Sequence, residues 1–255
     1  MPNQLTIVGL RGVPIVQPGD DLAAMMIAAC EKTGVALTDG DVVVVAQKIV
    51  SKSEGRFVEV ASVTPSERAI ALAAETQKEP RFVEIVLSES RRILRHRPNL
   101  IVAEHRLGFV MANAGIDHSN VGPDDGKERV LLLPLDPDAS ALALQQQLAQ
   151  RTKKRVAVII SDSFGRPWRR GTVGIALGVA GLPSVIDWRG QPDLFGRKLE
   201  VTETGFADEI AAAASLVQGQ AAEATPIVVV RGLAWTAPEA PASAIVRPPE
   251  HDLFR

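Results

Sequence analysis

Three short runs of aliphatic residues constrain the fold of this 255-residue chain more than any other feature. They read VVVV at 42–45, VAVII at 156–160 and IVVV at 227–230. Runs rich in β-branched residues and without polar alternation are typical of strands that are buried on both faces. With 46% hydrophobic residues, a chain of this length can build a substantial core around such strands. The sequence therefore predicts a folded, soluble protein built around a sheet.

Strand and helix patterns follow one another irregularly along the chain. We expect strands at 5–9, 41–50, 100–104, 108–112, 130–133, 156–160 and 227–230, and helices at 21–32, 66–76, 81–95, 139–151 and 203–217. Two strand candidates are adjacent near residue 107, whereas others alternate with helices. This order favours the α+β class over a regular doubly wound sheet. The segment 64–67, Thr-Pro-Ser-Glu, predicts a helix start with Thr64 as the cap.

The charge balance limits the partners of the chain. A net charge of -2 gives no global attraction to nucleic acid or to an anionic membrane, so we expect neither as a partner. The single cysteine, Cys30, lies in an apolar segment, which excludes an internal disulfide and predicts a packing role. The first residues lack a leader pattern and no apolar run is long enough to span a bilayer, so we expect a cytoplasmic location.

The segment 161–171, SDSFGRPWRRG, follows the aliphatic run at 156–160 directly. It offers Asp162 at the end of the expected strand, glycines that allow close backbone approach, and the arginines 166, 169 and 170. Carboxylates bind divalent cations, and planar guanidinium groups match phosphate or carboxylate oxygens. The segment predicts a site for a metal and a phosphate. The alternative is a turn with a solvated basic rim around Trp168.

Two further segments carry the same chemistry. Asp117 and Asn120 lie in a loop after the strand expected at 108–112, and with Asp162 they offer carboxylates from separate strands for Mg²⁺ or Mn²⁺ on a nucleotide. Such residues also form ordinary turns. Lys48 and Lys52 lie four residues apart and could contact a polyphosphate, although a solvated strand end is the alternative.

We assign no catalytic role to the other polar residues. His105 and His118 have no serine or cysteine partner at a spacing typical of nucleophilic catalysis, so we assign neither a catalytic role. Asp136 and Asp138 are expected to cap and start a helix, and Asp193 is expected to hold a turn. The glycines in GTVGIALGVAG at 171–181 predict close packing of backbone against backbone.

Several long motifs, in order, resemble the coenzyme F420-0:γ-glutamyl ligase family in its stand-alone form, without a nitroreductase-like domain. They are RGVPIVQPGDDL, QKIVSKSEGR, ANAGIDHSNV, LLLPLDPDAS, IISDSFGRPWRRGTVGIALGVAGLP, DWRGQPDLFGRKLEVTETGFADEIAAAASLV and IVVVRGL. The resemblance extends from about residue 5 to the end. It implies a catalytic unit over 1–235 with two intertwined subdomains of unknown boundary, a C-terminal arm over 236–255, and a homodimer.

The activity that the resemblance implies is a GTP-dependent ligase. It would join L-glutamate to the deazaflavin precursor F420-0 through an acyl phosphate, releasing GDP and phosphate, with Mg²⁺ or Mn²⁺ as one or two required ions. A need for K⁺ is left open. Positioning and charge neutralisation would do most of the catalytic work.

The resemblance also implies roles for individual residues. Asp162, Arg169 and Arg170 would be catalytic, with the arginines on the anionic tail of the precursor or on its acyl phosphate. GTP would contact Arg11, Gly12, Val13, Pro14, Gln47, Lys48, Lys52, Asn120, Gln218, Gly219, Gln220 and Thr225. Metal would contact Asp117, Asp162, Ser163 and Gln220. Because the Gln220 amide brings no negative charge, we expect the second metal position to be the weaker one.

Two alternatives stay open at this point. The chain could be a module that senses GTP without ligating anything, or a ligase of the same chemistry that acts on another carboxylate acceptor. Both predict GTP binding, so binding alone does not separate them from the first hypothesis.

Overall fold

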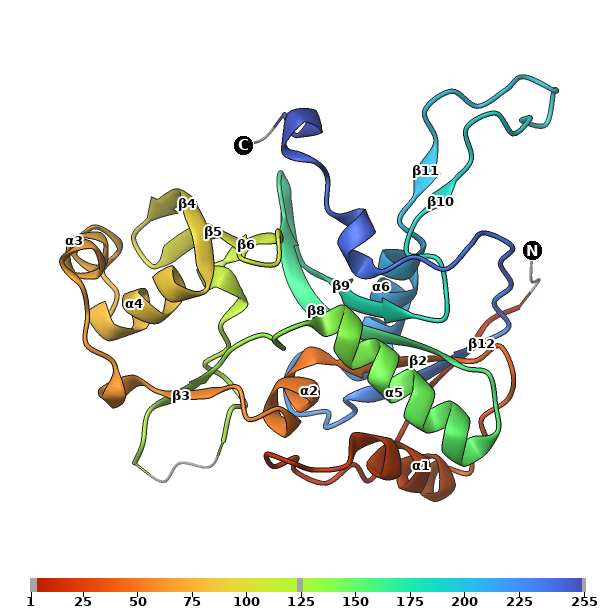
Figure 1. The fold of residues 1–255 in the computed structure, drawn as a ribbon, viewed down its shortest axis with the longest axis horizontal. Coiled ribbons are helices and arrows are strands. Elements are labelled where there is room, and N and C mark those ends of the chain that lie inside the picture. The colour runs from red at the N-terminus through yellow and green to blue at the C-terminus, as the bar shows by residue number, and fades with distance from the viewer. Residues whose placement is uncertain (1–3, 123–125, 254–255) are drawn as a thin grey trace.

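A computed structural model describes residues 4–122 and 126–253, and a five-stranded mixed sheet forms its core (Figure 1). The strand order is β1-β12-β2-β8-β9, with β2 and β8 parallel and the other neighbours antiparallel. The bounds are β1 Thr6–Gly9, β2 Val42–Ala46, β8 Ala157–Arg166, β9 Arg169–Ala180 and β12 Ile227–Arg231. The predicted α+β class with a mixed sheet is confirmed.

Helices cover both faces of this sheet, which explains the aliphatic runs. In β2, Val43 and Val45 pack into a core with α1 (Leu22–Thr33) and α5 (Pro137–Thr152). Val42 and Val44 point the other way, into a core with α6 (Phe206–Gln218). Successive side chains of a strand alternate between faces, so a strand covered on both sides needs an aliphatic residue at every position.

Residues 57–131 form a second subdomain, inserted in the sequence between α2 (Gln47–Ser53) and α5 and drawn at the left of Figure 1. Helices α3 and α4 pack against one face of its three-stranded sheet in a core of its own. Its elements are β3 Phe57–Glu59, η1 Val60–Ser62, α3 Glu67–Thr76, α4 Pro80–Ser88, β4 Ser90–Arg97, β5 Leu100–His105, β6 Val110–Ala112, η2 Asn113–Gly115 and β7 Arg129–Leu131. Strand β3 pairs with β7, so the chain enters and leaves the insertion as two antiparallel strands.

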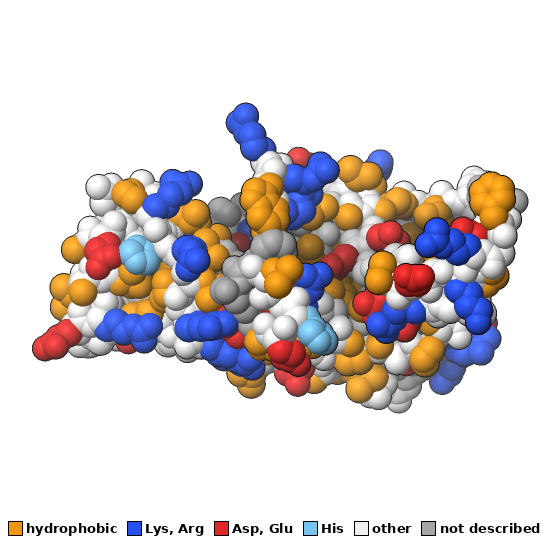
Figure 2. Space-filling model, turned by 90° about the horizontal axis from the view of Figure 1, so that it is seen from above, with side chains coloured by type: hydrophobic (Ala, Val, Ile, Leu, Met, Phe, Trp, Pro, Cys, Tyr) orange, Lys and Arg blue, Asp and Glu red, His pale blue; other side chains and the backbone are white. Residues whose placement is uncertain are grey.

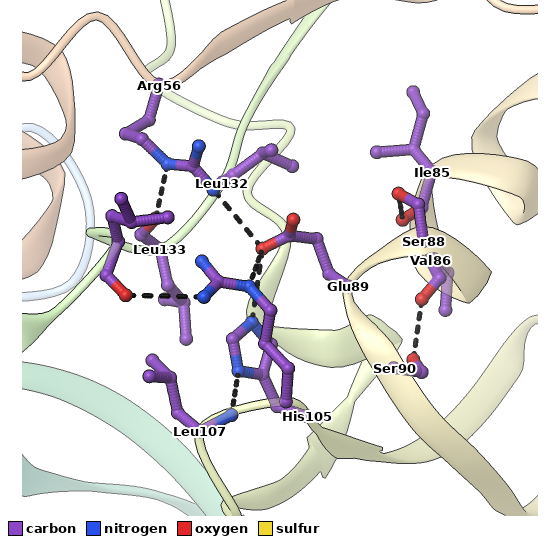
Figure 3. Close-up of polar contacts among 12 residues, drawn as sticks. Arg56, Ile85, Val86, Ser88, Glu89, Ser90, His105, Leu107, Leu132 and Leu133 are labelled. Atoms are coloured by element: carbon purple, nitrogen blue, oxygen red, sulfur yellow. Dashed lines mark hydrogen bonds and ion pairs between the residues drawn. The ribbon is translucent and has the colours of Figure 1, made fainter.

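A polar network around Glu89 fixes the insertion to the core (Figure 3). Arg56, Arg106 and His105 all approach Glu89 Oε2, at 3.3, 3.2 and 3.3 Å. The Leu107 N–H donates to His105 Nδ1, so Nε2 carries the proton that faces Glu89. Arg56 Nε also donates to the Leu133 carbonyl, in the segment that leads to α5. The network thus ties α4 and β5 to both ends of the insertion.

An apolar cluster forms a second junction between the subdomains. Met111 of β6 packs with Leu133 and with Phe164 and Leu177 of the β8–β9 hairpin. Phe109 meets Phe164 edge to face, with the ring centroids 6.2 Å apart. Since aromatic pairs in this geometry are favourable, the hairpin is held against the second subdomain.

Two expected elements are wrong in part. The strand expected over 41–50 ends at Ala46, and Gln47 begins α2. The helix expected over 81–95 ends at Ser88, and residues 90–97 form β4. Arginine has no strong preference for strands, so pairing of β4 with β5 decides its conformation. Strands β3, β10 (Ile186–Asp187) and β11 (Glu203–Thr204) were not expected.

The strand expected to end at residue 160 is also wrong at its end, because β8 runs on to Arg166 and turns through Pro167 and Trp168 into β9. The prediction of close backbone packing is confirmed for Gly174, Gly178 and Gly181 and is wrong for Gly171, where a Cβ would meet no atom within 4 Å. A Cβ on Gly174 would lie 2.5 Å from the Ala211 carbonyl oxygen, and one on Gly178 would lie 2.1 Å from that of Pro137. The helices therefore rest directly on the backbone of β9.

The expected caps are mostly correct. Asp136 caps α5, and Asp193 accepts hydrogen bonds from two N–H groups of its turn. Cys30, which was expected to have a packing role, is buried. Ser66 rather than Thr64 caps α3, because its side chain accepts from the Ala69 N–H.

Asp138 does more than start a helix. Its carboxylate accepts from the Val179 N–H on the outer edge of β9 and from the N–H groups of Ala242 and Ser243, where η3 (Ala242–Ile245) begins. The chain then continues through η4 (Pro249–His251). Within the described residues, no helix combines the length and the apolar character that crossing a membrane requires.

Candidate functional site

Three strands of the central sheet bring their neighbouring loops to the same edge. The Leu10 N–H donates to the Ile227 carbonyl and the Ala46 N–H to the Pro226 carbonyl, each at 2.8 Å. Ser161 of β8 lies opposite Ala46 of β2. The segments 11–14, 47–52 and 218–226, together with the middle of β8, therefore meet at this edge.

The second subdomain delivers Asp117 to this edge. Its backbone N–H and carbonyl pair with Leu131, which fixes the position of the residue after η2. Lys48 on α2 approaches from the core, with Nζ 3.1 Å from Asp117 Oδ1. The other carboxylate oxygen, Oδ2, is buried and has no hydrogen-bond partner among residues 4–122 and 126–253. A buried carboxylate oxygen without a partner is costly, and it marks a position where a cation or a donor would bind.

Asp162 stands beside Asp117 on β8. Burial, together with the neighbouring Asp117 carboxylate, raises the pKa of Asp162 to about 7, although its Oδ1 accepts a 2.7 Å bond from the Ser163 N–H and Lys48 lies nearby. Burial also raises the pKa of Asp117, against the attraction of Lys48 and Lys52. Two buried carboxylates this close hold a proton near neutral pH unless another cation joins them.

The residues around this pair fit a divalent cation. Asp117, after η2, and Asp162, on β8, bring hard oxygen ligands from two subdomains, and Asp117 Oδ2 is available for coordination. Among the described residues, no group of three or more His, Cys, Asp and Glu side chains forms a metal cluster. Mg²⁺ sites that share their ion with substrate phosphates take only one or two carboxylates from the protein, so the two aspartates would suffice for part of such a coordination shell.

The loop 218–225 borders the acidic pair. Ser161 Oγ lies 3.4 Å from Gln218 Oε1, and Gln218 Nε2 donates to the Pro226 carbonyl at 3.5 Å. Asn120 Nδ2 donates to the Ala221 carbonyl at 3.3 Å, so this loop contacts both β8 and the second subdomain.

Glu223 contacts the backbone of the loop 218–225 at Ala221 and lies close to Gly219. The Ala221 N–H donates to Glu223 Oε2 at 2.7 Å, and a Cβ on Gly219 would lie 2.2 Å from Glu223 Cδ. Gly219 also has a φ of 73°, which favours glycine. The Gln220 and Thr225 side chains lie in the same loop, and Thr225 Oγ1 donates to the Glu223 carbonyl. Within the described part of the chain, no hydrogen bond joins Gln220 to either aspartate.

The segment Arg11–Pro14 is held against α1. The Arg11 N–H donates to Thr33 Oγ1 at 2.8 Å, and Lys32 Nζ donates to the Gly12 carbonyl at 3.2 Å. Gly12 has a φ of 72°, and Val13 packs against the core. The backbone is fixed while the Arg11 side chain stays exposed toward solvent.

Gln47 and Lys52 complete the α2 side of the site. Gln47 is buried, its Nε2 donates to Ser51 Oγ at 2.7 Å, and its Oε1 is buried without a partner. Burial lowers the pKa of Lys52, repulsion from Lys48 lowers it further, and Asp117 opposes the shift. Lys48 and Lys52 thus lie close enough to Asp117 to favour its charged form, and Lys48 also acts on Asp162.

The arginines of the β8–β9 hairpin lie apart from the acidic pair. Arg169 and Arg170 follow the turn at its exposed tip, and Arg166 Nη2 donates to the Arg170 carbonyl at 3.4 Å. Four strand positions separate Asp162 from Arg166, roughly 13 Å at about 3.3 Å per residue. Their predicted contact with substrate stays a prediction.

The sequence did not predict that Ser161 neighbours the loop 218–225. The signal was its position directly after the aliphatic run 156–160, which buries it at the point where β8 passes Gln218. The Lys48–Asp117 ion pair was also missed, because it joins two subdomains.

Comparison with known proteins gives consistent matches. The family model of F420-0:Gamma-glutamyl ligase matches residues 11–232. The chain is 47% identical over 253 residues to the coenzyme F420:L-glutamate ligase of Methanothermobacter thermautotrophicus, covering 98% of this chain and 99% of that protein. The proteins of the same name from Archaeoglobus fulgidus and Methanocaldococcus jannaschii are 44% and 38% identical, over 99% of this chain and 97% and 98% of theirs.

Proposed function

The chain belongs to the F420-0:gamma-glutamyl ligase family, and from this premise we propose that it adds L-glutamate to the coenzyme F420 precursor with GTP as the phosphoryl donor. It is an enzyme of the ligase class, as the names of its full-length relatives indicate. GTP as the donor, the metal and the route through an acyl phosphate are parts of the proposal.

The observation that supports this chemistry best is the acidic pair beside two lysines. Asp117 and Asp162 lie close enough for each to influence the other's protonation, and Lys48 is ion-paired to Asp117. Phosphoryl transfer needs neutralisation of charge on the phosphate oxygens. Lys48 and Lys52 would act as point charges on a polyphosphate, while the loop 218–225, Asn120 and the segment 11–14 would surround the nucleotide.

The proposed reaction has two steps. A carboxylate oxygen of the precursor attacks the γ-phosphorus of GTP, the bond to the β-phosphate oxygen breaks, and GDP leaves. The amine of glutamate then attacks the acyl carbon, the carbon–oxygen bond to phosphate breaks, and the amine loses a proton. Both steps depend on alignment of reactants and exclusion of water more than on a protein nucleophile. The buried position of Asp117 and Asp162 suits that requirement.

Asp117 and Asp162 would hold Mg²⁺ or Mn²⁺, with Ser163 and Gln220 near a second, weaker position. When bound, the ion supplies charge stabilisation to the transferring phosphoryl group. Lys48 and Lys52 would orient the phosphates and, together with the bound cation, would keep both carboxylates ionised. A metal titration in the presence of GTP that finds two equally tight ions would contradict the weaker second position.

Arg169 and Arg170 are proposed to contact the anionic part of the precursor. Their exposure at the hairpin tip suits an extended acceptor better than the compact nucleotide. Arg169→Ala should raise the apparent KM for the precursor more than that for GTP. The reverse order would argue against this role.

The decisive experiment is mass spectrometry of F420-0 incubated with the protein, L-glutamate, GTP and either metal. We expect mass increments of one glutamate each, which disappear with Asp162→Ala. Nucleotide binding by the same samples separates the alternatives. Binding without any increment would favour a GTP sensor or a ligase for another acceptor.

A further inference from the structure

Strand β4 carries a row of arginines on one face of the second subdomain. Its pairing with β5 sets Arg92 opposite Glu104, Arg95 opposite Val102 and Arg97 opposite Leu100. Paired residues of adjacent strands point to the same side of a sheet. The three arginines do not occupy alternate positions throughout β4. Two β-bulges in the strand shift the alternation, so that all three side chains point to that side of the sheet.

The opposite face of the same sheet is covered. Ile101 and Ala103 of β5 are fully buried against α3 and α4, and Ile93, opposite Ala103, packs into the same core. His96, opposite Ile101, reaches Glu75 of α3. The arginines are therefore on the face that has no helix over it.

This face is strongly basic for a chain with a net charge of -2. The side chains of Arg91 and Arg92 are 59% and 52% exposed, and both approach the buried Glu104, at 3.8 and 2.7 Å. Arg95 and Arg97 are also exposed. Arg91 and Arg92 thus share the carboxylate of Glu104, and Arg95 and Arg97 add two further exposed guanidinium groups to the same strand.

The sheet that carries the basic face contacts the β8–β9 hairpin, in which Asp162 lies. Strand β6, two strand spacings or about 10 Å from β4, lies against β8. Figure 2 shows Lys and Arg side chains on the second subdomain, at the left, and near the centre of the same view. Strand β6 thus lies between β4 and the β8–β9 hairpin.

We propose that this β4 face holds the oligo-γ-glutamyl tail of the growing product. This inference rests on the proposed function. A glutamate joined through its γ-carboxyl keeps its α-carboxylate free, so each addition gives the tail one more negative charge. Every addition takes place at the end of the tail, so earlier units must move away from the reacting atoms as it grows. A row of exposed guanidinium groups can retain such a moving chain of carboxylates.

The composition of the face favours this ligand over a nucleic acid. Besides the arginines, its paired positions on β5 and β6 are Leu100, Val102, Glu104, Val110 and Ala112. None is aromatic, whereas single-stranded nucleic acid is held by aromatic stacking as well as by charge. Spaced carboxylates need only the charge and the planar forks.

Binding of free γ-linked oligoglutamates of one to six residues tests the proposal. We expect the affinity of the wild-type protein to rise about two- to threefold with each of the first three residues, as exposed ion pairs allow, and to fall with added salt. The double variant Arg95→Gln/Arg97→Gln should lose most of this dependence on length. Arg92 is left in place because it neutralises Glu104.

A matched control removes two exposed arginines from the helices on the other face, Arg68→Gln/Arg81→Gln, and should behave as the wild type. In ligation assays the β4 variant should keep its KM for GTP and its first glutamate addition, while later additions slow and the products become shorter. An unchanged product length, or wild-type affinity that does not depend on length, would overturn the proposal. So would equally tight binding of single-stranded DNA that the same substitutions abolish. Absence of any glutamate addition by the wild type would instead refute the proposed function.

Discussion

At the scale of single residues, the buried carboxylate of Asp162 makes stability depend on pH in an unusual direction. Burial and the neighbouring Asp117 raise its pKa to about 7, whereas an unfolded aspartate has a pKa of about 3.9. Between these values the folded state binds more protons than the unfolded state, so stability falls as the pH rises through this window. The metal-free protein is therefore expected to lose stability on approaching pH 8.

Asp162→Asn tests this electrostatic conflict. At pH 8 without metal we expect the variant to be more stable than the wild type by about 1–4 kcal/mol, since each pKa unit corresponds to roughly 1.4 kcal/mol. At pH 4 the variant and the wild type should have nearly equal free energies of unfolding. Urea denaturation at both pH values measures the difference. Divalent metal with GTP should raise the Tm of the wild type only, and a variant that is less stable than the wild type at pH 8 would contradict the shifted pKa.

Glu89 has the opposite electrostatic behaviour. Its burial alone would raise its pKa, but the contacts from His105, Arg106 and Arg56 outweigh burial and lower it (Figure 3). This contribution to stability is present above the unfolded pKa of about 4.3 and is lost as the pH falls through the lower folded value. Glu89→Gln should cost about 3 kcal/mol at pH 7, because it leaves the guanidinium groups of Arg56 and Arg106 without their counter-charge.

Urea denaturation between pH 7 and pH 3 checks the Glu89 prediction, since the variant should also lose part of the acid dependence. Glu75→Gln is a suitable control, because that carboxylate is 61% exposed and pairs only with His96. Its effect should stay below about 0.5 kcal/mol. Equal effects of the two substitutions would show that the network contributes no more than a surface ion pair.

At the scale of elements, the glycines of β9 determine how closely the helices approach the sheet. A Cβ on Gly178 would lie 2.1 Å from the Pro137 carbonyl oxygen at the start of α5, a contact that only backbone movement relieves. Gly178→Ala should therefore destabilise the protein by about 2–3 kcal/mol, as overpacking does. Gly165→Ala on β8 is the control, since a Cβ there meets no atom within 4 Å. Thermal melts that give the same Tm for both variants would refute the packing argument.

The elements that the sequence predicted correctly are those whose conformation is determined by their own residues. The aliphatic runs at 42–45, 156–160 and 227–230 form strands because burial on both faces leaves them no other environment. The β4 strand was predicted as helix because its arginines have no strong local preference and its pairing partner is remote. The hairpin at 161–171 was predicted as a loop, since Gly165 and Pro167 suggest a turn earlier than the pairing with β9 permits.

At the scale of the whole molecule, the candidate site depends on contacts between subdomains. The sequence predicted that Asp117 and Asp162 would act together, and the structure brings them together. It did not predict the Lys48–Asp117 ion pair or the contact of Asn120 with Ala221, because each joins residues from different subdomains. Such pairings follow from how the insertion docks through Glu89 and Phe164, which no local pattern encodes.

Assembly of two chains is the remaining expectation, and the excursion between β10 and β11 gives it a test. Leu194 and Phe195 near its tip are 98% and 94% exposed, and the excursion projects from the body of the molecule (Figure 1). Exposed aromatic and aliphatic side chains at one tip are typical of an interface. We predict that Leu194→Ser/Phe195→Ser weakens the homodimer at least tenfold, measured by sedimentation equilibrium over a range of concentrations. Leu216→Ser on α6, where the side chain is 84% exposed, should leave the dissociation constant unchanged. Dimers that survive the double substitution with unchanged affinity would assign the interface to another surface.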